Sequence, residues 1–171
     1  MEVGETVLRI LFVGMGATLI MDVSAFIQKR VFGLASPDYG LVGRWLGHML
    51  QGRFRHASIV TAPRVQNERL VGWVFHYITG CVFAMMLYGA QGLAWICNPS
   101  LMPALVTGLI SVIAPFFIMQ PAFGFGIAAS RAAAPNMARC RSVIAHLTFG
   151  IGLFGAGWLL MLLFPAPLCL R

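Results

Sequence analysis

The sequence is poor in charge, and poorest in negative charge. Only five of its 171 residues are Asp or Glu, and charged residues together make up 10% of the chain. Soluble domains carry about 25% charged residues, so this composition argues against an ordinary water-soluble fold. Carboxylates for acid–base catalysis are also scarce: apart from the N-terminal pair and a helix-capping Asp38, only Asp22 and Glu68 are left.

Several sequence motifs that carry chemistry are missing. The chain has no GxSxG motif of a serine hydrolase, no GxxxxGK[ST] phosphate loop, and no CxxC or HxxxH pair with the spacing of zinc ligands. No basic face with interleaved aromatic residues lies outside the hydrophobic runs, so nucleic acid is not an expected partner. These absences favour a protein that is not an enzyme.

Apolar residues, in contrast, make up 59% of the chain. They form four long runs, at about 7–27, 70–90, 101–130 and 142–164. A helix that spans a membrane needs roughly 20 mainly apolar residues. We therefore predict a single all-α transmembrane domain over residues 1–171, folded as an integral membrane four-helix bundle.

The third run is too long for one straight span, because about 30 residues at ~1.5 Å each exceed the hydrocarbon core. It contains Pro115 and Pro121, and a proline inside a helix removes a backbone hydrogen bond and clashes with the preceding turn. We expect a kink between them. The helix then either continues as a tilted span, or residues 121–130 form a second piece at the membrane surface.

The distribution of basic residues predicts an orientation. Lys and Arg are concentrated in residues 28–70 and 131–141, whereas residues 91–100 carry no charge. The positive-inside rule places the two basic segments in the cytoplasm, and both chain termini then face outward. Cys97 and Cys169 would also lie on the outer, oxidising side, where a disulfide between them is compatible with the topology.

The first basic segment also predicts a helix of its own. Ser36-Pro37 is a helix-start signal, an N-cap followed by proline. We expect an amphipathic helix in the membrane interface, with Gly43, Arg44 and His48 on its polar side. Its apolar side would carry Leu41, Val42, Trp45, Leu46 and Met49.

Arginines of the same loop are expected to contact anionic lipid head groups, and the alternative is a phosphate-binding patch for a head group or nucleotide. These arginines are Arg44, Arg53, Arg55, Arg64 and Arg69.

Each predicted span contains a polar residue that is costly to bury in lipid. They are Asp22, His76, Gln120 and His146, and the predicted orientation places all four in the cytoplasmic half. Each shares a helix face with small residues, which mark the surfaces where membrane helices approach closely. We predict a polar pocket formed by these four side chains and roofed by His48 and Arg44.

Three interpretations of this pocket remain open. The polar groups can simply hydrogen-bond across helix contacts and fix the packing. They can hold a small ligand, a quinone, a proton or a divalent metal, for which the candidate ligands are Asp22, His76, His146, His48 and His56. His76 and His146 can also serve as axial ligands of a haem.

The leading functional hypothesis is a small membrane binding or accessory module. The alternatives are a small oligomeric transporter or channel for a proton, metal ion or small solute, and a redox protein that binds haem or quinone. The expected partners are the lipid bilayer with its anionic head groups, and either further copies of the chain or another component of a membrane complex.

Four segments together resemble a known group of proteins. They are SPDYGLVGRWLGHMLQGRFRH (36–56), GWVFHYITG (72–80), APFFIMQPAFGFGIAAS (114–130) and RSVIAHLTFGIGL (141–153). In order and spacing they are similar to a bacterial inner-membrane family of unknown function, domain-of-unknown-function family 2938. The resemblance implies a multi-pass protein of the bacterial inner (cytoplasmic) membrane, with both termini periplasmic under the predicted orientation. It implies no activity. It also implies that the family motifs include Asp22, Arg44, His48, His56, His76, Gln120 and His146.

Overall fold

The computed structural model describes residues 3–34, 36–92 and 94–165, and these residues form helices and loops without a strand. Four stretches are long and apolar enough to cross a membrane. They are helix α1 (Val3–Phe32), helix α3 (Glu68–Gln91), the stretch Leu101–Ala122 and helix α7 (Pro135–Leu163). The all-α class predicted from the sequence is confirmed.

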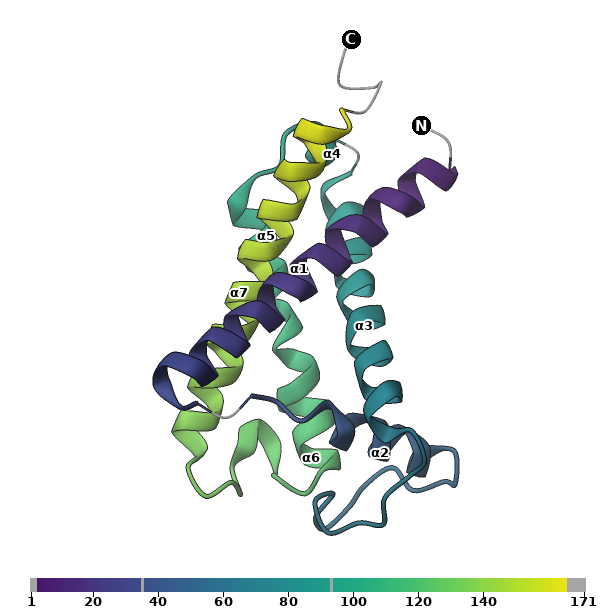
Figure 1. Ribbon diagram of the computed structural model, residues 1–171, viewed down its shortest axis with the longest axis vertical. Helices are drawn as coiled ribbons and strands as arrows, with labels where there is room; N and C mark the ends of the chain where they lie inside the picture. The colour runs from purple at the N-terminus through teal and green to yellow at the C-terminus, as the bar shows by residue number, and fades with distance from the viewer. Residues whose placement is uncertain (1–2, 35, 93, 166–171) are drawn as a thin grey trace.

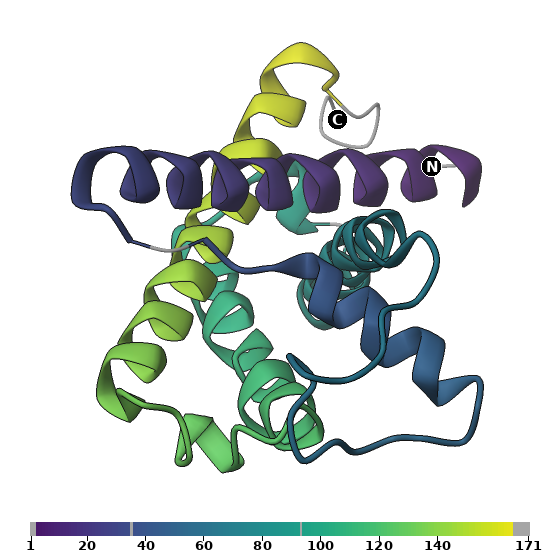
Figure 2. The same cartoon turned by 60° about the horizontal axis from the view of Figure 1, so that its bottom comes forward.

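Helix α1 packs across both α7 and α3, and α7 also packs on α5 (Leu101–Ser111), as Figure 1 shows. A short helix α2 (Tyr39–Met49) packs against the start of α3. Figure 2 shows α2, the loop that follows it and the turn after α6 (Gln120–Ala122) at one end of the molecule. The short helix α4 (Ala94–Cys97) precedes α5.

Helices α1 and α7 extend beyond the predicted spans. Helix α1 begins at Val3 and α7 at Pro135, whereas the hydrophobic runs predicted starts at 7 and 142. The extra turns of α7 carry Arg139 and Arg141, which the hydropathy pattern had assigned to a loop. The boundaries differ because hydropathy marks only the apolar part of a helix, and backbone hydrogen bonds continue the helix into polar residues.

The third run does not continue to residue 130. Helix α5 passes into a π-helical turn, η1 (Ala114–Met119), in which the N–H of Gln120 donates to the carbonyl of Pro115, five residues back. The helical stretch ends at Ala122, and the chain then turns before a short 3-10 segment at Ile127–Ala129. The helix therefore does not continue as one tilted span to residue 130, because the prolines and the glycines that follow divide the run.

Helix α2 buries the side that was predicted to be polar. Its N-cap is Asp38 rather than Ser36, and the Asp38 carboxylate accepts the N–H of Gly40 at 2.9 Å. A Cβ at Gly43 would overlap the carbonyl of Glu68, so the two backbones touch. This backbone contact turns the glycine side of α2 toward α3, and the apolar spacing alone could not reveal it.

Small residues also lie at the contacts between the long helices. Gly14 of α1 meets the backbone of Cys81 on α3, and Gly80 lies against Thr18. Gly152 of α7 meets the backbone of Ala17 in the same way, at 2.9 Å for an added Cβ. The glycine-rich faces predicted from the sequence are thus helix contacts, and the polar residues on those faces are drawn inside.

Arg9 is a charge within the first span that the sequence reasoning overlooked. Its side chain is buried, donates to the Glu5 carboxylate at 2.8 and 3.0 Å, and donates to the carbonyl of Phe164 at 2.8 Å. Because Phe164 is the C-cap of α7, Arg9 satisfies a helix-terminal acceptor. The start of α1 is therefore joined to the end of α7.

Candidate functional site

Asp22 of α1 and His76 of α3 meet inside the bundle, 54 residues apart in sequence. The His76 Nε2 lies 3.1 Å from the Asp22 Oδ1, and both side chains are 14% exposed. The Tyr39 hydroxyl donates to the same oxygen at 3.2 Å. Burial and the nearby Asp22 raise the pKa of Tyr39 above its usual value, so Tyr39 keeps the proton that it donates.

Aromatic rings enclose this carboxylate–imidazole pair. The Tyr39 ring stacks on His76 with centroids 4.1 Å apart, and Trp73 lies 4.6 Å from Tyr39. The Tyr77 ring packs edge-on to His76 at 5.7 Å. Within this enclosure the Asp22 Oδ2 is buried and forms no well-aligned hydrogen bond, although the Tyr77 hydroxyl lies near the carboxylate. A buried carboxylate oxygen without a partner is energetically costly, so it marks a place where a donor can bind.

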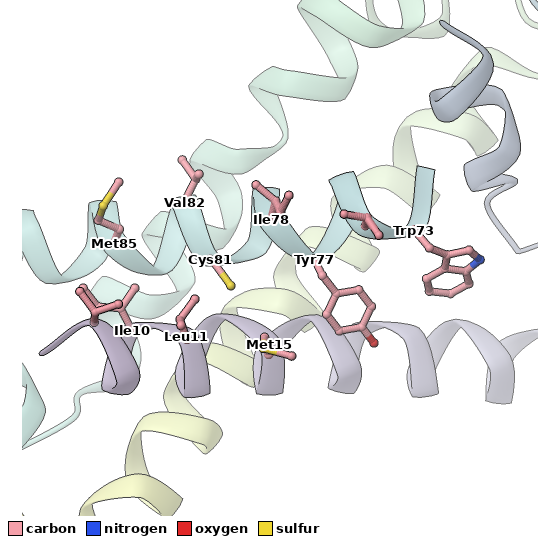
Figure 3. Close-up of a pocket in the computed structure, with 11 residues that line it drawn as sticks. Ile10, Leu11, Met15, Trp73, Tyr77, Ile78, Cys81, Val82 and Met85 are labelled. Atoms are coloured by element: carbon pink, nitrogen blue, oxygen red, sulfur yellow. The ribbon is translucent and has the colours of Figure 1, made fainter. Parts of the chain in front are cut away.

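An apolar groove of about 600 Å³ runs between α1 and α3 and reaches the same aromatic residues. Trp73 and Tyr77 belong both to the groove and to the surroundings of His76. Figure 3 shows Tyr77 directed toward α1 between Trp73 and Cys81, with Met15 facing it from α1. The polar cluster thus lies beside this open apolar groove.

The other two predicted pocket residues find separate partners. The Nδ1 of His146 lies 2.6 Å from the Ser111 hydroxyl, which also donates to the Gly108 carbonyl. Gln120 reaches Ser142 at 3.4 Å, and its Oε1 is buried without a partner. Only Asp22 and His76 of the predicted four are in direct contact.

Arg44 does not roof this cluster but joins α2 to α3. Its guanidinium makes a bidentate pair with Glu68, with both distances 2.8 Å, and Arg44 is 6% exposed. The Nη1 group donates to the carbonyls of Ile59, Val60 and Ala62 at 3.1–3.2 Å. Since its donors are used internally, Arg44 is not available to a lipid head group, unlike the exposed Arg53, Arg55, Arg64 and Arg69.

His48 and His56 form a second pair at the same end. The His48 Nδ1 lies 2.7 Å from the His56 Nε2, and the rings stack 4.9 Å apart. Burial and the neighbouring His48 and Arg53 lower the pKa of His56 below its usual value, although a backbone contact with Ala122 opposes this. His56 is therefore a neutral imidazole near neutral pH.

The metal-ligand candidates do not gather into one site. Among the residues that the structure describes, no three His, Cys, Asp or Glu side chains lie close enough to hold a metal ion. The five candidates divide into the Asp22–His76 pair, the His48–His56 pair and His146, which bonds to Ser111 instead. Cys97 takes part in a disulfide; Cys169, its predicted partner, lies outside the described residues.

Some residues of the cluster were not found from the sequence. Tyr39, Trp73 and Tyr77 were not selected, although Trp73 and Tyr77 flank His76 at helical spacing. Their spacing was a usable signal. Trp73 lies three residues before His76 and Tyr77 one residue after it, so both can fall on the same broad face of the helix as the buried histidine. Ser111 and Glu68 had no sequence signal beyond being polar.

The fold and the polar cluster define a class: an all-helical protein with four helices long and apolar enough to cross a membrane. The chain belongs to the family DUF2938, described as a protein of unknown function, whose family model matches residues 11–160. The resemblance found from the four sequence segments is thereby confirmed. No curated protein and no solved structure matches the chain significantly, so the family assignment brings no activity with it.

Proposed function

We propose that this protein is a multi-pass protein of the bacterial inner membrane that binds a small amphipathic molecule, as a binding or accessory module. One observation carries the proposal. The buried Asp22 carboxylate, held by His76 and Tyr39, keeps one oxygen unpartnered beside an apolar groove. Ionisable groups are retained at such depth in a membrane chiefly for function.

The geometry limits the chemistry of the ligand. An unpartnered carboxylate oxygen accepts hydrogen bonds, so the polar end of the ligand carries a donor such as a hydroxyl or an amine. The groove is lined almost entirely by apolar side chains, among them Leu11, Ile78 and Val82, so the rest of the ligand is hydrocarbon. Such a molecule would reach the site from the bilayer, without passing through water.

The orientation follows from charge. The end of the molecule with α2 and the loop after it carries the exposed arginines, and the described stretch 94–100 at the other end carries no charge. The positive-inside rule then places α2 in the cytoplasm. It places the polar cluster in the cytoplasmic half and both termini in the periplasm.

Mass spectrometry of small molecules extracted from the purified protein tests the binding proposal. We expect a bound species in the wild type that is depleted in Asp22→Asn and in Ile78→Trp, which fills the groove. The matched control is Ile151→Trp on α7, because Ile151 and Ile78 are 53% and 54% exposed and Ile151 lies outside the groove. Equal retention in all three variants, or no bound species, would contradict the proposal.

A second candidate is the transport of a proton or small cation through the bundle. The π-helical turn at Ala114–Met119 supports it, because such interruptions often lie at functional sites of membrane helices. Flux into liposomes that is abolished by Asp22→Asn would establish this function.

A Soret band lost on changing His76 or His146 would instead establish haem binding.

A further inference from the structure

Two segments far apart in the sequence are tied together beside the His48–His56 pair. The backbone N–H of His56 donates to the carbonyl of Ala122 at 2.9 Å. The backbone N–H of Ile59 donates to the carbonyl of Phe123 at 3.0 Å. Gly124, with φ +91°, lies so close to Ala57 that a Cβ would overlap the Ala57 carbonyl. The loop after α2 and the turn after α6 therefore form one rigid surface (Figure 2).

A second pocket, of about 450 Å³, lies between these two segments. This volume falls within the range of ordinary small-ligand sites, roughly 300–1,000 Å³. The side chains and backbone that line it include Arg55 and His56 from the first segment, and Gly126, Ser130 and Arg131 from the second. Unlike the groove between α1 and α3, it has two arginines, a histidine and a serine among its lining residues.

The two arginines have no carboxylate to pair with. Neither Arg55 nor Arg131 forms an ion pair with any residue that the structure describes. The sequence explains why: residues 69–171 contain no Asp or Glu, and none lies between Asp38 and Glu68. Asp38 caps α2, and Glu68 is already bound to Arg44 in a bidentate pair. The counter-charge for this pocket must come from outside the chain.

His56 adds a hydrogen-bonding group to the same pocket. Its Nε2 is paired with His48, whereas its Nδ1 is buried near the Ala122 backbone and forms no well-aligned hydrogen bond. If the proton between the two rings is on His48, the neutral His56 carries its own proton on Nδ1. That N–H is a buried donor that an anionic acceptor would satisfy.

We infer that this pocket binds a phosphate group, either of a lipid head group or of a free phosphate compound. Guanidinium forks match the tetrahedral oxygens of phosphate and bind them in a bidentate manner. The hydroxyl of Ser130 and the imidazole of His56 supply donors of the kind that complete such a site. This inference concerns a site separate from the Asp22 cluster and stands whether or not that cluster binds a ligand.

Binding of two probes to the full-length protein tests the inference. The probes are inorganic phosphate, added to protein in a non-ionic detergent, and phosphatidylglycerol in mixed micelles, followed by thermal unfolding and native mass spectrometry. We expect at least a tenfold weaker affinity in Arg55→Gln and in Arg131→Gln. The matched control is Arg64→Gln, an exposed arginine of the same loop outside the pocket, which should change affinity less than twofold.

The outcomes separate the two sources of phosphate. Binding of both probes with this dependence on Arg55 and Arg131 supports a site for free phosphate compounds, and binding of phosphatidylglycerol alone supports a lipid head-group site. Equal losses in all three variants would mean diffuse attraction to the basic surface and would overturn the inference. So would failure of both probes to bind. Unfolding temperatures without ligand show that each variant is folded.

Discussion

A single buried charge in this protein can be matched completely by groups from distant parts of the chain. Arg44 is the clearest case, because its guanidinium is matched by both oxygens of Glu68 and by three backbone carbonyls. The sequence indicated a lipid contact at Arg44, since an arginine in a basic loop usually faces outward. Its partner is 24 residues away, and no local pattern connects the two positions.

Removing one member of this pair should be costly. Glu68→Gln leaves the buried guanidinium without its counter-charge, and breaking a buried pair in this way costs about 3–5 kcal/mol. The measurement is the free energy of unfolding in mixed detergent micelles. Arg64→Gln, at an exposed position, serves as the control and should change the free energy by less than about 0.5 kcal/mol. A loss of similar size in both variants would show that Arg44 does not depend on Glu68.

The His48–His56 pair should make stability depend on pH. The pKa of His56 is lowered in the folded protein, so the unfolded chain binds more protons just below the ordinary histidine value of about 6.5. The contribution of His56 to the free energy of unfolding is therefore fully present above the pKa of the unfolded chain. It is lost as the pH falls from there through the lower pKa of His56 in the folded protein.

Thermal unfolding measured between pH 8 and pH 5 checks this expectation. His56→Gln should flatten the dependence, whereas the exposed Arg64→Gln should keep the wild-type profile. An identical decline in His56→Gln and the wild type would assign the pH effect to other groups.

At the scale of helices, glycine decides which faces meet. The hydrophobic runs predicted four spans with centres close to those observed, because hydropathy depends only on local composition. The packing of α2 on α3 was not predicted, because the two backbones touch at Gly43 and Gly72, on the side of α2 that carries its polar residues. A close contact between two backbones can be predicted only when the position of the second helix is known, and the sequence of one helix does not give it.

Two glycines of α3 provide a matched test of this contact. A Cβ at Gly72 would overlap the Tyr39 carbonyl, whereas a Cβ at Gly89 meets nothing within 4 Å. Gly72→Ala should therefore push α2 away and cost about 1–3 kcal/mol, as overpacking does. Gly89→Ala should be neutral or slightly stabilising. Unfolding of the two variants in the same detergent decides the matter, and equal effects would contradict the proposed role of Gly72.

For the whole molecule, the sequence predicted that polar residues turn inward but not which of them meet. Asp22 and His76 meet because α1 and α3 are in contact along the faces of Gly14 and Gly80. His146 bonds to Ser111, on α5, which packs against α7. Which helices lie next to each other is decided only in the assembled bundle. The sequence could therefore predict the region in which the polar residues lie, but not which of them form hydrogen bonds with each other.

The same assembly makes a prediction about the orientation in the membrane. The loop after α2, which contains Gly52, and the segment before α7, which contains Ala133, lie at the end with α2, whereas helix α4 lies at the other end (Figure 1), and Asn98 directly follows α4. Basic residues flank the first two positions and not the third, so insertion should retain the first two in the cytoplasm. A reporter that fluoresces only in the cytoplasm should be active when inserted after Gly52 or Ala133. A phosphatase that folds only in the periplasm should be active after Asn98.

The opposite pattern would mean that the protein has the reverse orientation, with the Asp22 cluster in the outer leaflet. A mixed pattern would mean that one of the four stretches does not cross, because removing one span reverses every loop that follows it.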